Sequence, residues 1–221
     1  VCLYSLFDRP VWLHGGGDGL VRPLCEKVRQ WGGEILLRHK VSRLVAENKK
    51  ITEAITENGQ RFTAPWVVST IHPKAMLKLL DEDALQPVFR ENVLDLEESS
   101  GSFLLHIALK KEMASVQPIN YLCYTPGQKI SPVFYLNSPS LLDKEPDKPR
   151  IGVCTFVEAA SFLTFRGSKV GRRPAGYQEL KQRYTEELLG EVITLFPELE
   201  GNISKIYAST PLTNEDYTAS E

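Results

Sequence analysis

The sequence predicts an α+β fold, an antiparallel or mixed sheet with flanking helices. Many short stretches alternate apolar and polar residues with a period of two, and few helical patterns separate them. One long helix interrupts the later strands, because Leu180, Tyr184 and Leu188 keep four-residue spacing and Pro197 closes the pattern. We expect this helix, residues 177–196, to pack against the sheet. The strands expected in that sheet are residues 103–109, 121–124, 133–137, 152–158 and 203–209.

A glycine-rich loop and a helix dominate the start of the chain. Residues 11–13 are a short strand candidate, and the glycines that follow form a loop that regular structure would not tolerate. Helical spacing then runs from Leu20 to Trp31, with Asp18 as the expected N-cap. Gly32 and Gly33 end this predicted helix, since glycine adopts the left-handed conformation that helix ends favour.

From residue 34 the apolar period changes to two, beginning with Ile35 and Leu37. A β-meander follows, because polar turns separate the apolar stretches and Asn58-Gly59 is typical of a two-residue hairpin turn. The meander strands that we expect are residues 41–46, 51–56 and 61–63. Residues 66–70 then read as a buried strand, and a short helix begins at Ala75.

Composition excludes several function classes. The net charge of -2 and the pI near 6.2 supply no basic surface for a phosphate backbone, so we expect no nucleic-acid partner. No apolar run approaches the roughly 18–20 residues that a membrane helix needs. The four cysteines and four histidines are scattered, which predicts no metal site. Buried thiols in a reducing, cytoplasmic compartment are the simplest interpretation.

The string His14-Gly15-Gly16-Gly17 matches the oxyanion-hole loop of some lipases and esterases. An esterase also needs a nucleophile elbow of the form G-x-S-x-G and a late histidine, whereas this sequence has no such elbow and its last histidine is His106. Two other interpretations stay open. The glycines could hold a phosphate at the helix N-terminus, although the register fails the known nucleotide fingerprints, or they could simply let strand and helix pack closely.

The order of the motifs carries more information than any one of them. Along the chain come Gly-Gly-x-x-x-Leu and a helix, Gly-Gly-Glu-Ile, Val-x-x-Leu, two turns, and Ala-x-x-Val-Val-Ser-Thr before a proline. In this order the sequence resembles flavin amine-oxidase-type enzymes. The later segments, among them residues 134–140, Phe196-Pro197 and Thr210-Pro211-Leu212-Thr213, resemble the branch that holds phytoene desaturases, carotenoid isomerases and retinol saturases. Lys148 and the basic insert at residues 167–173 depart from that pattern and put the substrate in doubt.

The resemblance implies a division of the chain and a cofactor, FAD. Residues 1–80 would be part of an FAD-binding α/β domain, including the β-meander, and residues 81–221 a substrate-binding domain. It implies cofactor contacts at Lys40, Val41, Ser69 and Thr70, with Gly15 and Gly16 near the flavin or the substrate. It assigns no catalytic residue, since the flavin carries the redox chemistry.

Further expectations follow from the same resemblance. The substrate would be an apolar polyene or isoprenoid, held in an apolar tunnel beside the strands at residues 103–109 and 133–137 and reached from a membrane surface that the protein contacts peripherally. The reaction would be a desaturation, saturation or isomerisation. An amine-oxidase-like flavoenzyme and a non-catalytic binding or interaction module stay open as alternatives. Because G-x-G-x-x-G is missing here, we expect a fragment that does not itself retain FAD.

Overall fold

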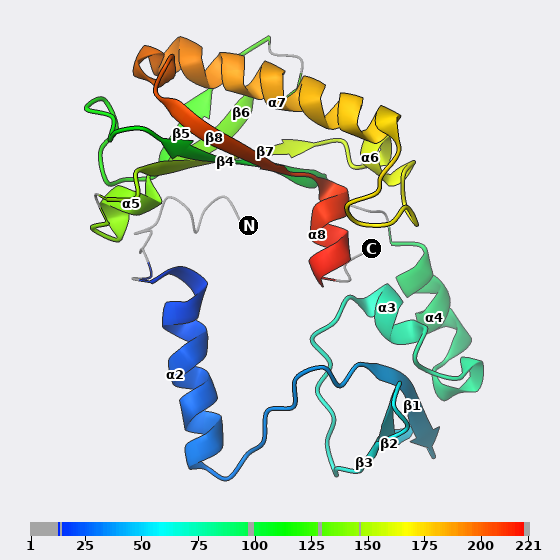
Figure 1. The fold of residues 1–221 in the computed structure, drawn as a ribbon. Coiled ribbons are helices and arrows are strands. Elements are labelled where there is room, and N and C mark those ends of the chain that lie inside the picture. The colour runs from blue at the N-terminus through cyan, green and yellow to red at the C-terminus, as the bar shows by residue number, and fades with distance from the viewer. Residues whose placement is uncertain (1–12, 14, 97–99, 128–129, 146, 219–221) are drawn as a thin grey trace.

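The computed structural model describes residues 13, 15–96, 100–127, 130–145 and 147–218. Two antiparallel sheets organise these residues (Figure 1). A three-stranded sheet has the order β1-β2-β3, and a five-stranded sheet has the order β5-β6-β7-β4-β8. The strands are β1 (Val41–Glu47), β2 (Lys50–Thr56), β3 (Arg61–Phe62), β4 (Gly101–Leu109), β5 (Tyr121–Tyr124), β6 (Val133–Asn137), β7 (Arg150–Val157) and β8 (Ile203–Ser209). The α+β class expected from the sequence is confirmed.

The helices differ greatly in length and in burial. The longest are α7 (Ala175–Leu195) and α2 (Gly16–Gln30). The shorter ones are α3 (Pro73–Leu77), η1 (Glu82–Ala84), α4 (Pro87–Leu94), α5 (Pro139–Leu142), α6 (Ala160–Leu163), η2 (Pro197–Leu199) and α8 (Pro211–Thr218). Within the described residues, no helix has the length and apolar character needed to cross a bilayer.

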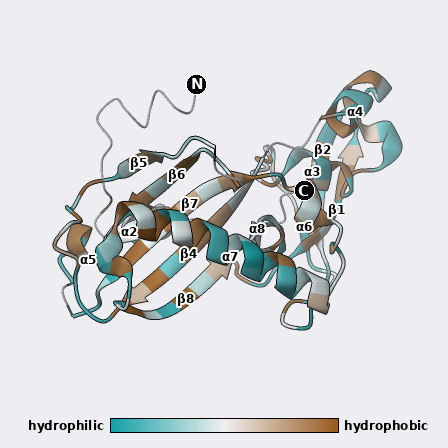
Figure 2. Ribbon diagram, turned by 90° about the horizontal axis from the view of Figure 1, so that it is seen from above, coloured by the Kyte–Doolittle hydropathy of each residue, from teal (hydrophilic) through white to brown (hydrophobic). Residues whose placement is uncertain are grey.

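The main core lies between the five-stranded sheet and α7. Figure 2, looking down from above, shows α7 crossing over the strands. Leu188 and Val192 of α7 are almost fully buried in the same core as Phe103 and Leu105 of β4, and the ring of Tyr184 lies tilted to that of Phe103 with centroids 5.7 Å apart. The predicted helix and its packing face are confirmed. All five predicted strands of this sheet are also present, within two residues of the expected ends.

The β-meander is likewise confirmed, but its second turn is longer than the two-residue turn expected at Asn58-Gly59, since β2 ends at Thr56, β3 begins at Arg61 and the N–H of Thr56 donates to the carbonyl of Gln60 at 2.9 Å. β1 pairs with β2 from Val41 opposite Thr56, and β2 pairs with β3 through Ala54 opposite Phe62. The first turn contains Asn48 and Lys49, both with positive φ, which matches the right-handed twist of a two-residue hairpin.

Three sequence predictions in the first 70 residues are wrong. Residues 66–70 do not form a buried strand, because a continuous apolar strand needs paired neighbours and covered faces and the described residues supply neither. Trp66 and Val68 are each 86% exposed. Leu37 lies in an exposed turn after Ile35, where Arg38 adopts a positive φ of 61° and interrupts any extended pattern.

The third correction concerns the start of α2. The helix begins at Gly16 with Gly15 as N-cap, so Asp18 lies inside the first turn. A negative charge is still favourable there because it faces the positive end of the helix dipole. No residue of α2 is buried. The strand candidate at residues 11–13 lies outside the described residues except for Leu13, which is not in a strand, and His14 also lies outside them.

Candidate functional site

The five-stranded sheet has one covered face and one open face. On β4 the odd-numbered residues from Phe103 to Leu109 are buried beneath α7, whereas Leu104 and Ala108 are only half-buried and His106 is exposed. β7 shows the same alternation, with Phe156 50% exposed on the open side. Figure 1 shows α7 on one side of the sheet and α8 leaving it on the other. The strands therefore present a second surface that α7 does not cover.

The register of the strands arranges this open face in rows, since directly opposed residues share a face. One row, here called the apolar row, joins Leu122, Tyr135, Cys154, Leu104 and Ser209. The next row toward the start of β7, here called the polar row, joins Asn137, Gly152, His106 and Tyr207. Phe156 lies one row beyond the apolar row, and its ring contacts Tyr135 edge to face at 6.3 Å.

The apolar row is also uncharged. Burial raises the pKa of the Cys154 thiol, which therefore stays protonated at neutral pH. Within the five described strands, none of the residues on the open face is Asp or Glu. Such a surface can hold an uncharged, apolar ligand through its area and its aromatic edges.

The expected tunnel is replaced by this open surface. The α7 side of residues 103–109 and 133–137 is solidly packed, so no ligand can lie there. On the other side Leu122 and Tyr207 are 41% and 56% exposed, so these residues line a surface and not an enclosed channel.

The glycine-rich loop lies beside the polar end of the open face. The backbone N–H of Gly15 donates to Asp143 Oδ1 at 3.2 Å, and Asp143 Oδ2 lies 3.5 Å from Arg150 Nη2. Arg150 opens β7, two residues before Gly152 of the polar row. The first two residues of the loop, Gly15 and Gly16, have φ values of 79° and 62°, which favour glycine. The binding role of the two glycines remains a prediction.

Lys40 and Val41 occupy a different part of the molecule. Lys40 is exposed and pairs with Glu57 at 2.6 Å, while its carbonyl accepts the N–H of Glu57. Val41 begins β1 and is half-buried. Ser69 and Thr70 lie in the exposed segment that follows Trp66. Figures 1 and 2 both place the small sheet far from α5 and the N-terminal end of α2, so the structure does not bring the six candidate residues into one site.

Sequence reasoning missed the residues of the open face. An ordinary half-exposed strand carries polar residues on its outward-facing positions. Here those positions are apolar or aromatic: Leu104, Tyr135, Cys154 and Phe156. The sequence did contain a signal for this face, because β4, β6 and β7 carry apolar residues at both inward-facing and outward-facing positions. Strands of that kind need cover on both faces of the sheet.

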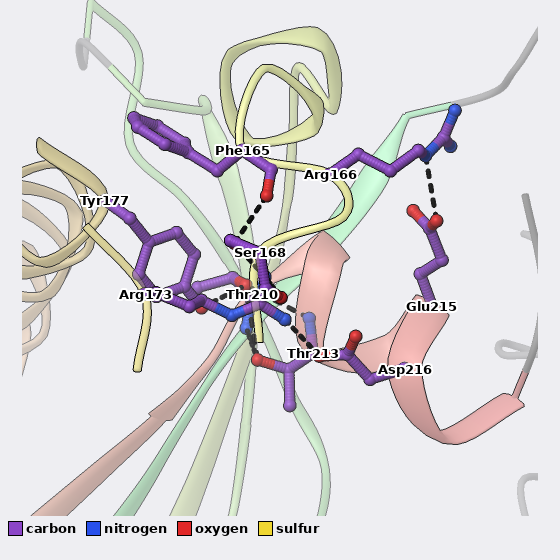
Figure 3. A network of polar contacts seen from close by, with 9 residues as sticks. All are labelled: Phe165, Arg166, Ser168, Arg173, Tyr177, Thr210, Thr213, Glu215 and Asp216. Carbon is purple, nitrogen blue, oxygen red and sulfur yellow. Dashed lines mark hydrogen bonds and ion pairs between the residues drawn. The ribbon is translucent and has the colours of Figure 1, made fainter. Parts of the chain in front are cut away.

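A polar network fixes the end of β8 where α8 begins (Figure 3). Thr210 and Thr213 cap each other, each backbone N–H lying 3.2 Å from the other's Oγ1. The hydroxyls of Tyr177 and Thr210 lie 3.0 Å apart. The Thr-Pro-Leu-Thr motif is therefore a helix start that is tied to α7.

The basic insert clamps the same helix. Arg173 pairs with Asp216, lies 4.9 Å from the centre of the Tyr177 ring and donates to Ser168 Oγ at 3.0 Å. Arg166 pairs with Glu215 at 2.8 Å. The insert thus holds α8 on the side of the sheet opposite α7, where Asn214 donates to Ser102 Oγ at 2.7 Å.

Comparison with known proteins gives the family. Residues 1–137 match the sequence profile of flavin containing amine oxidoreductases. The all-trans-retinol 13,14-reductase of Danio rerio is 23% identical over 235 residues, covering 93% of this chain and 39% of that protein. The Rattus norvegicus protein of the same name is 29% identical over 222 residues, covering 87% of this chain and 36% of its own length.

Two solved structures share the fold. The PF1083 protein from Pyrococcus furiosus aligns with a TM-score of 0.64 at 17% identity, covering 89% of this chain and 43% of that one. An oxidoreductase from Methanosarcina mazei aligns with a TM-score of 0.63 at 20% identity, covering 88% and 42%. The chain spans about two fifths of the length of these relatives. The resemblance to amine-oxidase-type flavoenzymes and their retinol saturase-related branch is confirmed. Because the profile match covers more than half of its residues, the chain belongs to the flavin containing amine oxidoreductase family.

Proposed function

We propose that this chain supplies the substrate-binding sheet of an FAD-dependent oxidoreductase acting on carbon-carbon double bonds of an apolar polyene or isoprenoid. The observation that carries the proposal is the uncharged, partly aromatic open face of the five-stranded sheet. The names of the Danio rerio and Rattus norvegicus relatives refer to reduction of one double bond of retinol. They favour saturation over desaturation or isomerisation.

The glycines of the loop fit part of such a cofactor. No side chain caps the start of α2, and a Cβ added to Gly16 or Gly17 would meet nothing within 4 Å. The Gly15 and Gly16 amides donate to Asp143 Oδ1 at 3.2 Å and to the Leu13 carbonyl at 2.9 Å, so an anionic or carbonyl group of the cofactor would replace these acceptors. Gly15 and Gly16 would contact one portion of the extended dinucleotide, and Lys40, Val41, Ser69 and Thr70 another, in line with their separation in the structure.

The division of labour follows from the chemistry. The bound flavin supplies hydride or electron transfer. The residues of this chain bind and orient the substrate: Leu104, Tyr135 and Phe156 contact its hydrocarbon part and exclude water from it. No acid or base on the open face is required for that role.

An amine substrate is the first alternative. A protonated amine is best held by a carboxylate or an aromatic cage, and the open face offers no carboxylate while carrying Arg150 and Lys205 at one end. This charge distribution favours a neutral polyene. A non-catalytic binding module is the second alternative, and flavin-dependent turnover by the full-length protein separates it from the enzyme.

A binding titration tests the proposal. All-trans-retinol is added to the chain and its fluorescence is followed for the wild type, for Phe156→Asp on the open face and for Leu24→Asp on α2. Both positions are exposed apolar residues, with 50% and 57% exposure, and circular dichroism establishes that each variant is folded. We expect Phe156→Asp to weaken binding at least tenfold and Leu24→Asp to leave it within twofold. Equal effects of the two changes would contradict the assignment.

A further inference from the structure

The polarity of the open face changes along the strands. From Phe156 through the apolar row to the polar row, aromatic and aliphatic side chains give way to an amide, an imidazole and a phenol. Same-face residues two apart in a strand are separated by about 6.6–6.8 Å, so these three rows span about 13 Å. A ligand lying along β4 and β7 would therefore meet an apolar environment at one end and a polar one at the other.

The polar groups of this row are available to a ligand. Within the described residues, no side-chain hydrogen bond occupies the polar atoms of Asn137, His106 or the Tyr207 hydroxyl. His106 is exposed and Tyr207 is 56% exposed. These side chains can each donate or accept a hydrogen bond without breaking one in the protein.

Gly152 lets the Asn137 side chain lie close over the strand. It lies directly between Asn137 and His106 in the register. A Cβ at this position would lie 3.0 Å from Asn137 Oδ1, which is a tight contact. The missing side chain therefore lets the Asn137 amide lie over Gly152 on the side of His106, so a small ligand group above the strand can reach both an amide and an imidazole.

Of the two charged residues beyond the polar row, Arg150 is paired with carboxylates and Lys205 lies over an aromatic ring. Arg150 Nη2 lies 2.8 Å from Glu145 Oε2 and 3.5 Å from Asp143 Oδ2, and Lys205 Nζ lies 4.6 Å from the centre of the Tyr207 ring. The row thus offers hydrogen-bonding side chains without a carboxylate, which suits an uncharged partner such as a hydroxyl.

We propose that the open face binds a polyene alcohol in one direction, with its hydroxyl at Gly152 between Asn137 and His106 and its hydrocarbon chain across Leu104 toward Phe156. This inference rests on the proposed function and deepens it, because it names the terminal group of the substrate and the residues that recognise it. The orientation also fixes which end of the polyene lies near the glycine-rich loop, since Gly15 contacts Asp143 at the polar end.

A matched pair of ligands tests this orientation. Affinities of the chain are measured for all-trans-retinol and for the hydrocarbon analogue in which a methyl group replaces its hydroxymethyl group. His106→Phe keeps a planar ring of similar size and removes both nitrogens, and Asn137→Leu keeps the branched shape and removes the amide. Loss of one neutral hydrogen bond predicts a decrease of about 3- to 10-fold for retinol and a change within twofold for the hydrocarbon.

Two further variants complete the design. Gly152→Ala places a methyl group 3.0 Å from Asn137 Oδ1, which displaces the amide and should weaken retinol binding more than hydrocarbon binding. Phe156→Ala should weaken both ligands alike, because it removes apolar contact from either. Circular dichroism and Tm establish that each variant is folded.

The outcomes separate the two proposals. If both ligands bind and the three polar-row variants weaken them equally, the orientation is overturned and the proposed function stands. The variants concerned are His106→Phe, Asn137→Leu and Gly152→Ala. Binding of neither ligand, or binding that Phe156→Ala leaves unchanged, overturns the proposed function and the orientation with it.

Discussion

At the scale of single residues, Glu198 shows how a carboxylate anchors a loop on the covered side of the sheet. Its two oxygens accept hydrogen bonds from the backbone N–H groups of Ala114 and Ser115 and from the Ser115 hydroxyl, at 2.7–3.2 Å. These hydrogen bonds, chiefly those from Ser115, hold the pKa of Glu198 below its usual value. Met113 and Val116 of the same loop are buried in the core, so the anchor keeps apolar residues in place.

The lowered pKa of Glu198 predicts a pH dependence with a definite sign. Its contribution to stability is fully present above the unfolded-state pKa of about 4.5 and is lost as the pH falls through the lower folded-state pKa. Glu198→Gln should therefore lower Tm at pH 6–7, and the difference from the wild type should shrink below about pH 4. Thermal unfolding followed across this pH range checks the prediction. Glu200→Gln, an exposed neighbour, is the control, and an equal change in both variants would contradict the anchoring role.

At the scale of elements, the strands and the long helix could be predicted because their burial is periodic. In α7 the predicted positions Leu188 and Val192 are buried and Leu180 and Tyr184 are half-buried against the core, and in β4 alternate residues are buried, since both elements cover one face within the described chain. Residues 66–70 could not be placed this way. A continuous apolar run predicts a strand only if a neighbour supplies hydrogen bonds, and periodicity says nothing about neighbours. For the same reason the open face could not be predicted from the sequence, because its apolar residues have the pattern of ordinary core residues.

Packing of α7 predicts a large effect of truncation. Leu188 is 1% exposed and lies in the core with Phe103 and Leu105. Leu188→Ala should lower the free energy of unfolding by about 2–5 kcal/mol, because it removes buried methyl groups and leaves a cavity. Leu195→Ala, at a position that is 46% exposed at the end of the same helix, should cost less than about 1 kcal/mol. Urea unfolding measures both, and similar costs would show that the packing face is wrong.

The clamp on α8 predicts a distinction between two adjacent arginines. The Arg173 side chain is 5% exposed in its contacts with Asp216 and Tyr177, whereas Arg172 is exposed. Arg173→Ala should destabilise the chain by about 1–3 kcal/mol, between the values for surface and buried ion pairs. Arg172→Ala should change stability by less than about 0.5 kcal/mol. Faster hydrogen exchange in α8 for the first variant alone would confirm the clamp, and equal exchange in both would contradict it.

At the scale of the whole molecule, the two sheets lie on either side of the boundary expected near residue 80. The three-stranded sheet ends at Phe62 and the five-stranded sheet begins at Gly101. The meander is joined to the segment after α3, where the N–H of Leu44 donates to the carbonyl of Leu79 at 2.7 Å and Arg43 pairs with Asp81 at 2.8 Å. The division into a cofactor part and a substrate part remains a prediction, and the candidate cofactor residues could be named only through the family resemblance.

This division predicts how the chain behaves toward FAD. Its sequence contains no G-x-G-x-x-G, and the candidate contacts fall into two separate groups. A few edge contacts cannot offset the several kcal/mol that immobilising so large a ligand costs. The purified chain should therefore be colourless after gel filtration and should not quench flavin fluorescence when titrated with FAD. A yellow preparation that retains stoichiometric FAD would contradict this prediction.

The central claim is that the open face of the five-stranded sheet binds the substrate. Photo-cross-linking tests it most directly, because α2 offers a competing exposed apolar surface with Leu20 and Leu24 at 51% and 57% exposure. The chain is irradiated with a photoreactive analogue of all-trans-retinol, and the labelled residues are mapped by mass spectrometry with unlabelled retinol as competitor. We predict competed labels on Leu104, Tyr135 and Phe156. Labels confined to α2, or labels that retinol does not compete away, would contradict the claim.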